Sequence, residues 1–283
     1  MRRTAITRGG RTAALTAVAA LIAVVWLTPT LWLIAGSLRP GREIFASLAP
    51  LSMRTFIPPA PTLNNFVAVL TGPFRVGLFN SLIVTSASIT GGIIVCAMAA
   101  FALSAMRLPA RDALFAVIVF TFLIPEEVIA LPLSNLFTAW GLQNTYPGLI
   151  LPAVGNGVAI FLLRQFFLSI PRELVEAGRV DGAGWWTIFL RLYVPLSKPA
   201  LISAGLLLFT GQWQAYLWPL LVTTRQDMFL APIVLAQMFG EFNQTDYGQV
   251  FAAAAILSLI PAAILFGSQS YFARSVVTSG IKE

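Results

Sequence analysis

The most polar segment of the sequence runs from Arg164 to Lys198 and carries eight charged residues, in a chain otherwise made of long apolar runs. Glu-Ala-Gly stands at 176–178, Asp-Gly-Ala at 181–183, and a proline follows at 195. So many charges exclude the segment from the hydrocarbon core of a bilayer. The residues predict two short helices joined at a glycine, with an apolar side. Such a segment suits either docking to a soluble partner or adsorption to lipid headgroups.

A second group of polar side chains lies inside one of the apolar runs, where Gln212, Trp213, Gln214 and Tyr216 are close together. Amide groups and aromatic faces within a membrane are what the path of a polar solute such as a sugar requires. Gln212 and Tyr216 are four residues apart, which places them on one face of a predicted helix. Alternatively, the aromatic residues form an interfacial belt and the glutamines bind neighbouring helices. Asn156, in an earlier run, is open to both interpretations.

Glu126 and Glu127 interrupt the apolar stretch 113–163. The apolar residues before them make only about 18 Å of helix, so the predicted span continues past both acids. We expect them near the outer interface or beside a hydrated cavity, because a charge at the bilayer centre is costly. A proton relay through them would make the protein an ion-coupled secondary carrier. The absence of histidine, of a further buried acid and of an inverted repeat argues against that alternative.

The composition is that of a polytopic membrane protein: 58% of the 283 residues are hydrophobic and 10% are charged, against about 25% charged in soluble domains. Without histidine the chain lacks the usual zinc ligand and general base, and no P-loop pattern for nucleotide phosphates occurs. We therefore predict no catalytic residue, no metal site and no cofactor bound by this chain, and hence no enzyme. Nucleic acid is not an expected partner, because no basic patch is interleaved with aromatic residues.

Apolar runs of about 20 residues can cross a bilayer as helices, and the turn-rich segment 140–148 divides the longest run in two. We predict an all-α polytopic membrane protein with six transmembrane helices, at residues 12–36, 79–106, 113–137, 147–167, 200–223 and 250–272. They form one domain, 12–273, which contains a cytoplasmic loop 168–199 and is flanked by an N-terminal segment 1–11 and a tail 274–283. Thirteen basic residues then lie inside and five outside, which predicts cytoplasmic N- and C-termini.

The charged segment resembles the EAA motif of ABC-importer permeases, which reads E-A-A, three residues, G, nine residues and then I-x-L-P. All spacings match, and the departures are Gly178 for the second alanine, Leu192 for isoleucine and Val194 for leucine. In that family the segment forms a coupling helix that seats in a cleft of the ATP-hydrolysing subunit. The resemblance implies that the residues of the motif dock to this ATPase: Glu176, Ala177, Gly178, Asp181, Gly182, Ala183 and Pro195.

Most of the chain is similar to the carbohydrate-uptake branch of these permeases, and in particular to the second permease subunit of maltose-type importers. The similarity lies in GQWQAYLWPLLVT (211–223), FRVGLFNSLIVTSASI (74–89), PEEVIALPLSNLF (125–137) and the tail VVTSGIKE. It implies a type I ABC-importer permease fold in the cytoplasmic (inner) membrane, working by alternating access. The implied partners are a second homologous permease, an ATPase dimer that uses ATP and magnesium, an extracytoplasmic solute-binding protein and membrane lipid.

The expected function is therefore that of a permease subunit of a sugar importer. Its translocation path has as candidates Gln212, Trp213, Gln214, Tyr216 and Asn156. Three alternatives stay open: an ABC importer of a non-sugar organic solute, a carrier coupled to ions through the two adjacent acids, and a membrane scaffold that transports nothing. The sequence does not name the sugar, because the binding protein of such a system largely sets its specificity.

Overall fold

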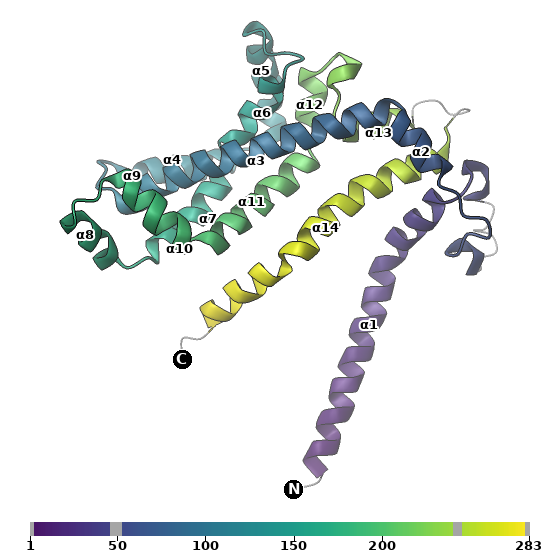
Figure 1. Cartoon of the computed structure of the whole chain (residues 1–283), viewed down its shortest axis with the longest axis horizontal. Coiled ribbons are helices and arrows are strands. Elements are labelled where there is room, and N and C mark those ends of the chain that lie inside the picture. The colour runs from purple at the N-terminus through teal and green to yellow at the C-terminus, as the bar shows by residue number, and fades with distance from the viewer. Residues whose placement is uncertain (1–2, 46–52, 240–244, 281–283) are drawn as a thin grey trace. The chain divides into compact units, whose positions relative to one another are not determined.

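The computed structural model of the chain describes residues 3–45, 53–239 and 245–280, and every regular element among them is helical (Figure 1). The chain divides into two compact units, each of which is considered by itself: Met1–Phe74 with Leu235–Ser258, and Arg75–Val234 with Leu259–Glu283. Residues 1–2 of the predicted N-terminal segment and 281–283 of the predicted tail lie outside the described residues.

The helices follow one another in the order that Figure 1 labels. They are α1 (Arg3–Ser37), α2 (Asn64–Thr71), α3 (Pro73–Ala105), α4 (Arg111–Thr121), α5 (Glu126–Ala139), α6 (Tyr146–Val154), α7 (Gly157–Leu168), α8 (Arg172–Val180), α9 (Trp185–Ile188), α10 (Val194–Leu196), α11 (Lys198–Trp213), α12 (Leu217–Val222), α13 (Ala231–Gln237) and α14 (Tyr247–Gly280). A π-helix, Phe189–Tyr193, joins α9 to α10, and short 3-10 helices occupy Gly41–Glu43, Met53–Thr55 and Gln226–Met228.

In the first unit, the end of α1, the start of α2 and the start of α14 are held together by one buried amide. The Nδ2 atom of Asn65 donates to the carbonyl oxygens of Ser37, at 2.8 Å, and Arg39, at 2.6 Å. Gly248 lies against the same amide, and a Cβ atom there would come within 2.8 Å of Asn65 and of the Arg39 carbonyl. The position therefore requires glycine, because the chain approaches too closely for a side chain. Trp32 packs edge-on against the ring of a phenylalanine in α14.

Among the described residues, three segments are long and apolar enough to cross a membrane as continuous helices: Gly10–Ser37, Pro73–Ala105 and Tyr247–Gln269. Three further candidates are pairs of helices bent at a short break, and counting each pair as one span gives up to six. The bends measure 95° between α4 and α5, 41° between α6 and α7, and 82° between the α9–α10 run and α11. The prediction of an all-α polytopic membrane protein is confirmed, with half of its spans bent.

The third predicted span, 113–137, differs from expectation, because the helix stops before the two acids. α4 ends at Thr121 and α5 begins at Glu126, after Pro125 in an extended conformation (φ −57°, ψ 135°). A proline lacks the N–H group that a continuing helix needs and disfavours helical backbone in the residue before it. Glu126 and Glu127 therefore form the first turn of a new helix, rather than the interior of a continuous one.

The fifth predicted span, 200–223, is also interrupted. α11 ends at Trp213, and α12 begins at Leu217 with Pro219 in its first turn. The ring of Pro219 would clash with the carbonyl of residue 215 if one helix continued through both. Gln212 and Tyr216 therefore do not lie on one face of a single helix, and that part of the prediction was wrong.

The core of the second unit brings α3, α7, α11 and the Phe189–Tyr193 π-helix together. Small residues are fully buried where the helices meet, such as Ala100 on α3, Ala159 on α7 and Ala204 on α11. Small side chains let helix backbones approach closely, which favours van der Waals packing between helices inside a bilayer. The ring of Phe101 packs against Tyr193 at 4.8 Å between centroids. This core anchors both sites described below.

Candidate functional site

The predicted docking segment is a short helix, α8, that ends in a glycine turn. Gly182 has a φ of +80°, and its N–H donates to the carbonyl of Arg179 at 3.1 Å. The N–H of Ala183 donates to the carbonyl of Gly178 at 2.9 Å. These two bonds are the pair that defines a Schellman motif, in which glycine adopts the left-handed conformation after a helix. A Cβ atom on Gly182 would meet nothing within 4 Å, so the backbone conformation alone selects glycine.

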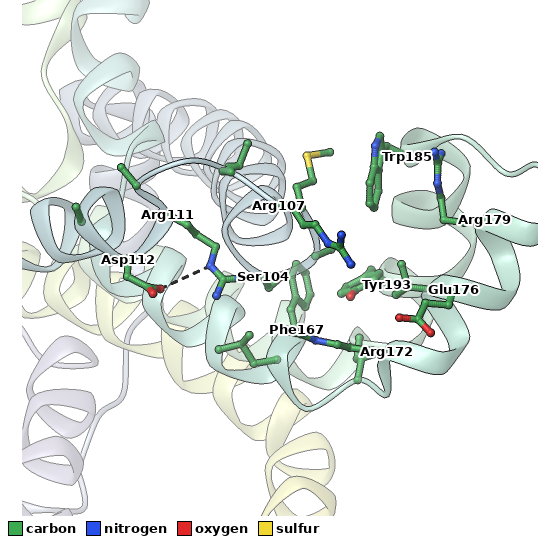
Figure 2. Close-up of a pocket in the computed structure, with 18 residues that line it drawn as sticks. Ser104, Arg107, Arg111, Asp112, Phe167, Arg172, Glu176, Arg179, Trp185 and Tyr193 are labelled. Carbon is green, nitrogen blue, oxygen red and sulfur yellow. Dashed lines mark ion pairs between the residues drawn. The ribbon is translucent and has the colours of Figure 1, made fainter.

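A single arginine fastens this turn to the following helix. Arg179 donates from Nη1 to the carbonyl of Ala183 at 3.2 Å, and its guanidinium lies 5.0 Å from the ring centroid of Trp185. Trp185 packs in turn against Phe101 of α3, at 6.2 Å between ring centroids. α8, the turn and α9 are thus connected to the core through one row of side chains, part of which Figure 2 shows.

One side of the segment is buried and the other is free within the second unit. Val175, Ile188, Phe189 and Tyr193 face the core. The predicted docking residues are exposed or half-buried: Glu176, Ala177, Asp181, Gly182 and Pro195 are exposed, and Gly178 and Ala183 are half-buried. Large apolar side chains share the outer side, namely Leu174, Val180, Trp186 and Leu190. Val180 is 87% exposed, which is unusual for a valine at the end of a helix.

A cavity of about 990 Å³ lies between this segment, the ends of α3 and α7, and the start of α4. We call it the arginine-lined cavity, because four of its lining residues are Arg107, Arg111, Arg172 and Arg179. Asp112 and Glu176 also line it, and Figure 2 shows the charged side chains around it. The cavity has therefore more basic than acidic groups.

Arg164 is a buried arginine next to this cavity that sequence reasoning assigned to the charged loop. It lies within α7 and is 7% exposed. Its Nε atom donates to the carbonyl of Leu103 at 3.2 Å, Nη2 donates to Asp112 at 3.3 Å, and the guanidinium covers the ring of Phe115 at 3.9 Å. Leu103 is in the last turn of α3, where carbonyls lack helical partners. Arg164 thus caps α3 and joins α7 to the start of α4.

The predicted translocation residues meet at a second cavity, of about 480 Å³, in the same unit. Gln212, Gln214, Tyr216 and Asn156 line it, brought together by the break after α11 and the bend before α7. Trp213 does not: it is 3% exposed and stacks on Phe209 at 5.7 Å between ring centroids. We call this space the carboxylate-lined cavity, because the acids of the first turn of α5 line it too.

Two polar residues that line this cavity, Asn156 and Ser88, differ in their hydrogen bonding. The Oδ1 atom of Asn156 accepts from the N–H of Ala159 at 2.9 Å, so it caps α7, and its amide NH₂ remains for other partners. Ser88 lies in α3, is 2% exposed, and its Oγ has no hydrogen-bond partner among the described residues. The sequence prediction did not single out Ser88, since a serine inside a long apolar helix most often bonds to its own backbone.

Hydrogen bonds hold the segment after α12 against the 140–148 turn. Asn80 donates from Nδ2 to the carbonyls of Asp227 and Phe229, at 2.8 and 3.0 Å, and accepts from the hydroxyl of Tyr146 at 2.8 Å. The Nε1 atom of Trp218 donates to the carbonyl of Gly148 at 3.1 Å. The hydrogen bond from Arg225 lowers the pKa of the exposed Asp227 carboxyl below its ordinary value. This side of the carboxylate-lined cavity is therefore rigidly built.

Comparisons with known proteins agree with this architecture. The family model described as "Binding-protein-dependent transport system inner membrane component" matches residues 92–278. The chain is 32% identical over 269 residues to the arabinooligosaccharides transport system permease protein AraQ of Halalkalibacterium halodurans, covering 93% of this chain and 94% of that protein. It is 38% identical over 201 residues to the sn-glycerol-3-phosphate transport system permease protein UgpE of Rhizobium meliloti, covering 71% of each.

A solved structure shares the fold. It is a chain of a bacterial ABC transporter involved in the import of the acidic polysaccharide alginate, which superposes with a TM-score of 0.76 at 24% identity. The match covers 100% of this chain and 99% of that one.

Proposed function

Because the chain belongs to the family of inner-membrane components of binding-protein-dependent transport systems, we propose that it is the permease subunit of an ATP-driven importer of a sugar or related polar solute. It is a multi-pass inner-membrane protein, and its relatives are transport permeases rather than enzymes. In the proposed assembly a second homologous permease completes the path. An ATPase dimer uses ATP and magnesium, and an extracytoplasmic binding protein delivers the solute.

The observation that carries the coupling role is the two-sided build of α8. Its inner side, at Val175, packs on the core and Glu176 lines the arginine-lined cavity, while Ala177, Val180 and Asp181 are exposed and do not line that cavity. A partner can therefore cover the outer side without disturbing the core. This supports α8 as the helix that seats on the ATPase, and it supports the docking role of the motif residues.

The contents of the carboxylate-lined cavity support a hydroxylated solute. Gln212, Gln214 and the free NH₂ of Asn156 offer hydrogen bonds, and Tyr216 offers a ring beside them. A small number of convergent polar groups in an otherwise apolar cavity is typical of a site for a small molecule. The name of AraQ refers to arabinooligosaccharides and that of UgpE to sn-glycerol 3-phosphate, so these relatives leave open whether the solute is neutral or anionic.

The ion-coupled carrier has Glu126 and Glu127 in its favour, since both line a cavity. Family membership favours coupling to an ATPase instead. The scaffold that transports nothing has no feature of the structure in its favour.

The coupling proposal is tested by purifying the tagged protein from its native membrane and quantifying the ATPase that accompanies it. We expect the ATPase to be lost when Ala177→Arg places a large charged side chain on the exposed side of α8. Gly178→Ala is the matched control on the same helix. Its Cβ atom would lie 3.7 Å from Ile188, an ordinary contact, and alanine is the residue that the EAA pattern has there.

The outcome that contradicts the proposal is wild-type recovery of the ATPase with Ala177→Arg. Loss of the ATPase with both variants would also contradict it, because the control leaves the outer side unchanged. Intact folding of each variant is checked by its elution volume in mild detergent.

A further inference from the structure

We propose that the carboxylate-lined cavity selects solutes by charge, admitting uncharged polyhydroxylated molecules and excluding anionic ones such as phosphate esters and uronates. This inference rests on the proposed function and narrows it, because it decides between the two solute classes that the relatives leave open. It concerns the permease itself rather than the binding protein. Three features support it: the position of the two acids, the polar groups beside them, and the absence of lysine and arginine among the described residues that line the cavity.

The break at Pro125 puts both acids at the cavity. Glu126 and Glu127 occupy the first turn of α5, and each is exposed within the unit. Acidic side chains are favourable at this position, because the first N–H groups of a helix have no partners within it. The chain bends by 95° between α4 and α5 at this break.

Neither carboxylate is engaged by the second unit. Among the residues that the structure describes, neither Glu126 nor Glu127 makes an ion pair or a hydrogen bond. None of the described residues that line the cavity is a lysine or an arginine. An anionic solute would therefore meet two like charges and no counter-charge among these residues, and like charges repel.

The remaining polar groups suit hydroxyl groups. Gln212 and Gln214 each provide a donor and an acceptor, and carboxylates accept hydrogen bonds from neighbouring hydroxyls. The Oγ atom of Ser88 lines the same cavity, is buried, and has no partner among the described residues. An unsatisfied buried hydroxyl costs free energy, which a hydroxylated solute or a water molecule would recover. Ser88 is independent of the acids and also indicates a ligand.

Charge selection can be measured without knowing the solute, by placing a cysteine in the cavity of the assembled transporter in native membranes. Gly211 lines the cavity, and a Cβ atom there meets nothing within 4 Å, so Gly211→Cys adds a thiol without a clash. The natural Cys96 is fully buried and provides a silent background. The probes are two methanethiosulfonates of similar size, one with a trimethylammonium group and one with a sulfonate group.

We expect the ratio of cationic to anionic reaction rates at Gly211→Cys to exceed that of a free thiol in solution by about tenfold or more. Replacing the acids, Glu126→Gln with Glu127→Gln, should abolish this excess. Glu173→Gln, which removes an exposed acid on α8 away from the cavity, should leave it unchanged. Two results would overturn the inference. One is a ratio of cationic to anionic rates that equals the free-thiol value, and the other is a raised ratio that the double substitution leaves unchanged.

A ratio at the free-thiol value would mean that groups outside this chain, such as a basic side chain of the second permease, neutralise the acids. An excess that persists in the double variant would mean that charges other than these two acids set the ratio. The proposed function fails in a different way. If Ala177→Arg retains the ATPase while the rate ratio behaves as expected, the coupling proposal is wrong and the charge of the cavity stands. If the ATPase behaves as expected and the rate ratio does not, only the charge selection is wrong.

Discussion

The two cavities of the second unit use charged residues in opposite ways. In the arginine-lined cavity, Arg179 bonds to the turn after α8, and Asp112 pairs with Arg111 and Arg164. In the carboxylate-lined cavity, the two acids have no partner among the described residues. The charges of Asp112, Arg111, Arg164 and Arg179 thus join parts of the fold, whereas the two acids are available to something that enters. Only 10% of the residues are charged, and whether a charged side chain has a partner separates these structural charges from those available to a solute.

α3 connects the two regions. Ser88 lines the carboxylate-lined cavity and Ser104 lines the arginine-lined one, sixteen positions further along the same helix. At 1.5 Å per residue the two serines are about 24 Å apart, most of the thickness of a bilayer core. The carboxylate-lined cavity thus lies beside the middle of α3, and the arginine-lined cavity lies at its C-terminal end.

The largest expected effect tests whether the charges beside the arginine-lined cavity are structural. Arg164→Met keeps the volume of the side chain but removes the cap on Leu103 and the contact with Phe115. We expect a loss of about 2–3 kcal/mol of stability, because a buried carbonyl loses its partner and a cation leaves a helix C-terminus. Thermal unfolding in detergent measures it. Arg191→Met, at an exposed arginine, serves as the control. An equal loss of stability with both substitutions would show that Arg164 has no special structural role.

A smaller effect is expected at the turn after α8. Gly182→Ala forces alanine into a left-handed conformation, which costs about 1 kcal/mol, while Gly182→Asn should cost less. Opening of the turn then becomes about fivefold more frequent with alanine. Limited proteolysis at residues 181–184 reports this opening. If the three residues at this position give the same cleavage rate, the turn is not held by the Schellman hydrogen bonds.

The smallest expected effect tests whether Ser88, at the carboxylate-lined cavity, contributes to the stability of the protein. Ser88→Ala should change stability by no more than about 0.5 kcal/mol, because the Oγ atom has no partner to lose among the described residues. Ser81→Ala, on the same helix, should cost about 1 kcal/mol, since its Oγ accepts from the N–H of Ala231 at 2.9 Å. Unfolding of both variants is measured side by side. A larger loss at Ser88 than at Ser81 would show that Ser88 has a structural role.

Much of this arrangement follows from the sequence. Periodicity and charge predicted the membrane class, the turn at 140–148 and the glycine turn after α8. They also grouped four of the five candidate path residues correctly in space, although Gln212 and Tyr216 come together through a break and not along one helix face. Trp213 was placed with its neighbours in sequence, but a tryptophan beside a helix end packs inward as readily as it faces a cavity.

The position of the break at Pro125 could not be predicted, because proline in a membrane helix does not always interrupt it. Pro29, Pro132, Pro152 and Pro261 all lie inside helices of this chain. Neighbouring helices and local adjustments satisfy the freed backbone groups in such cases. The burial of Arg164 was missed for a related reason: only the folded chain brings Leu103, Asp112 and Phe115 to one side chain.

The Schellman turn has a mechanical consequence. Its two backbone hydrogen bonds, the Arg179 side chain and the Trp185–Phe101 contact form an unbroken series from α8 to α3. A flexible turn after α8 would not pass a displacement of α8 on to α3, whereas a turn fixed by these contacts would. If α8 docks to the ATPase as proposed, these contacts would carry a displacement of α8 to Phe101, and glycine at position 182 allows the turn on which they depend.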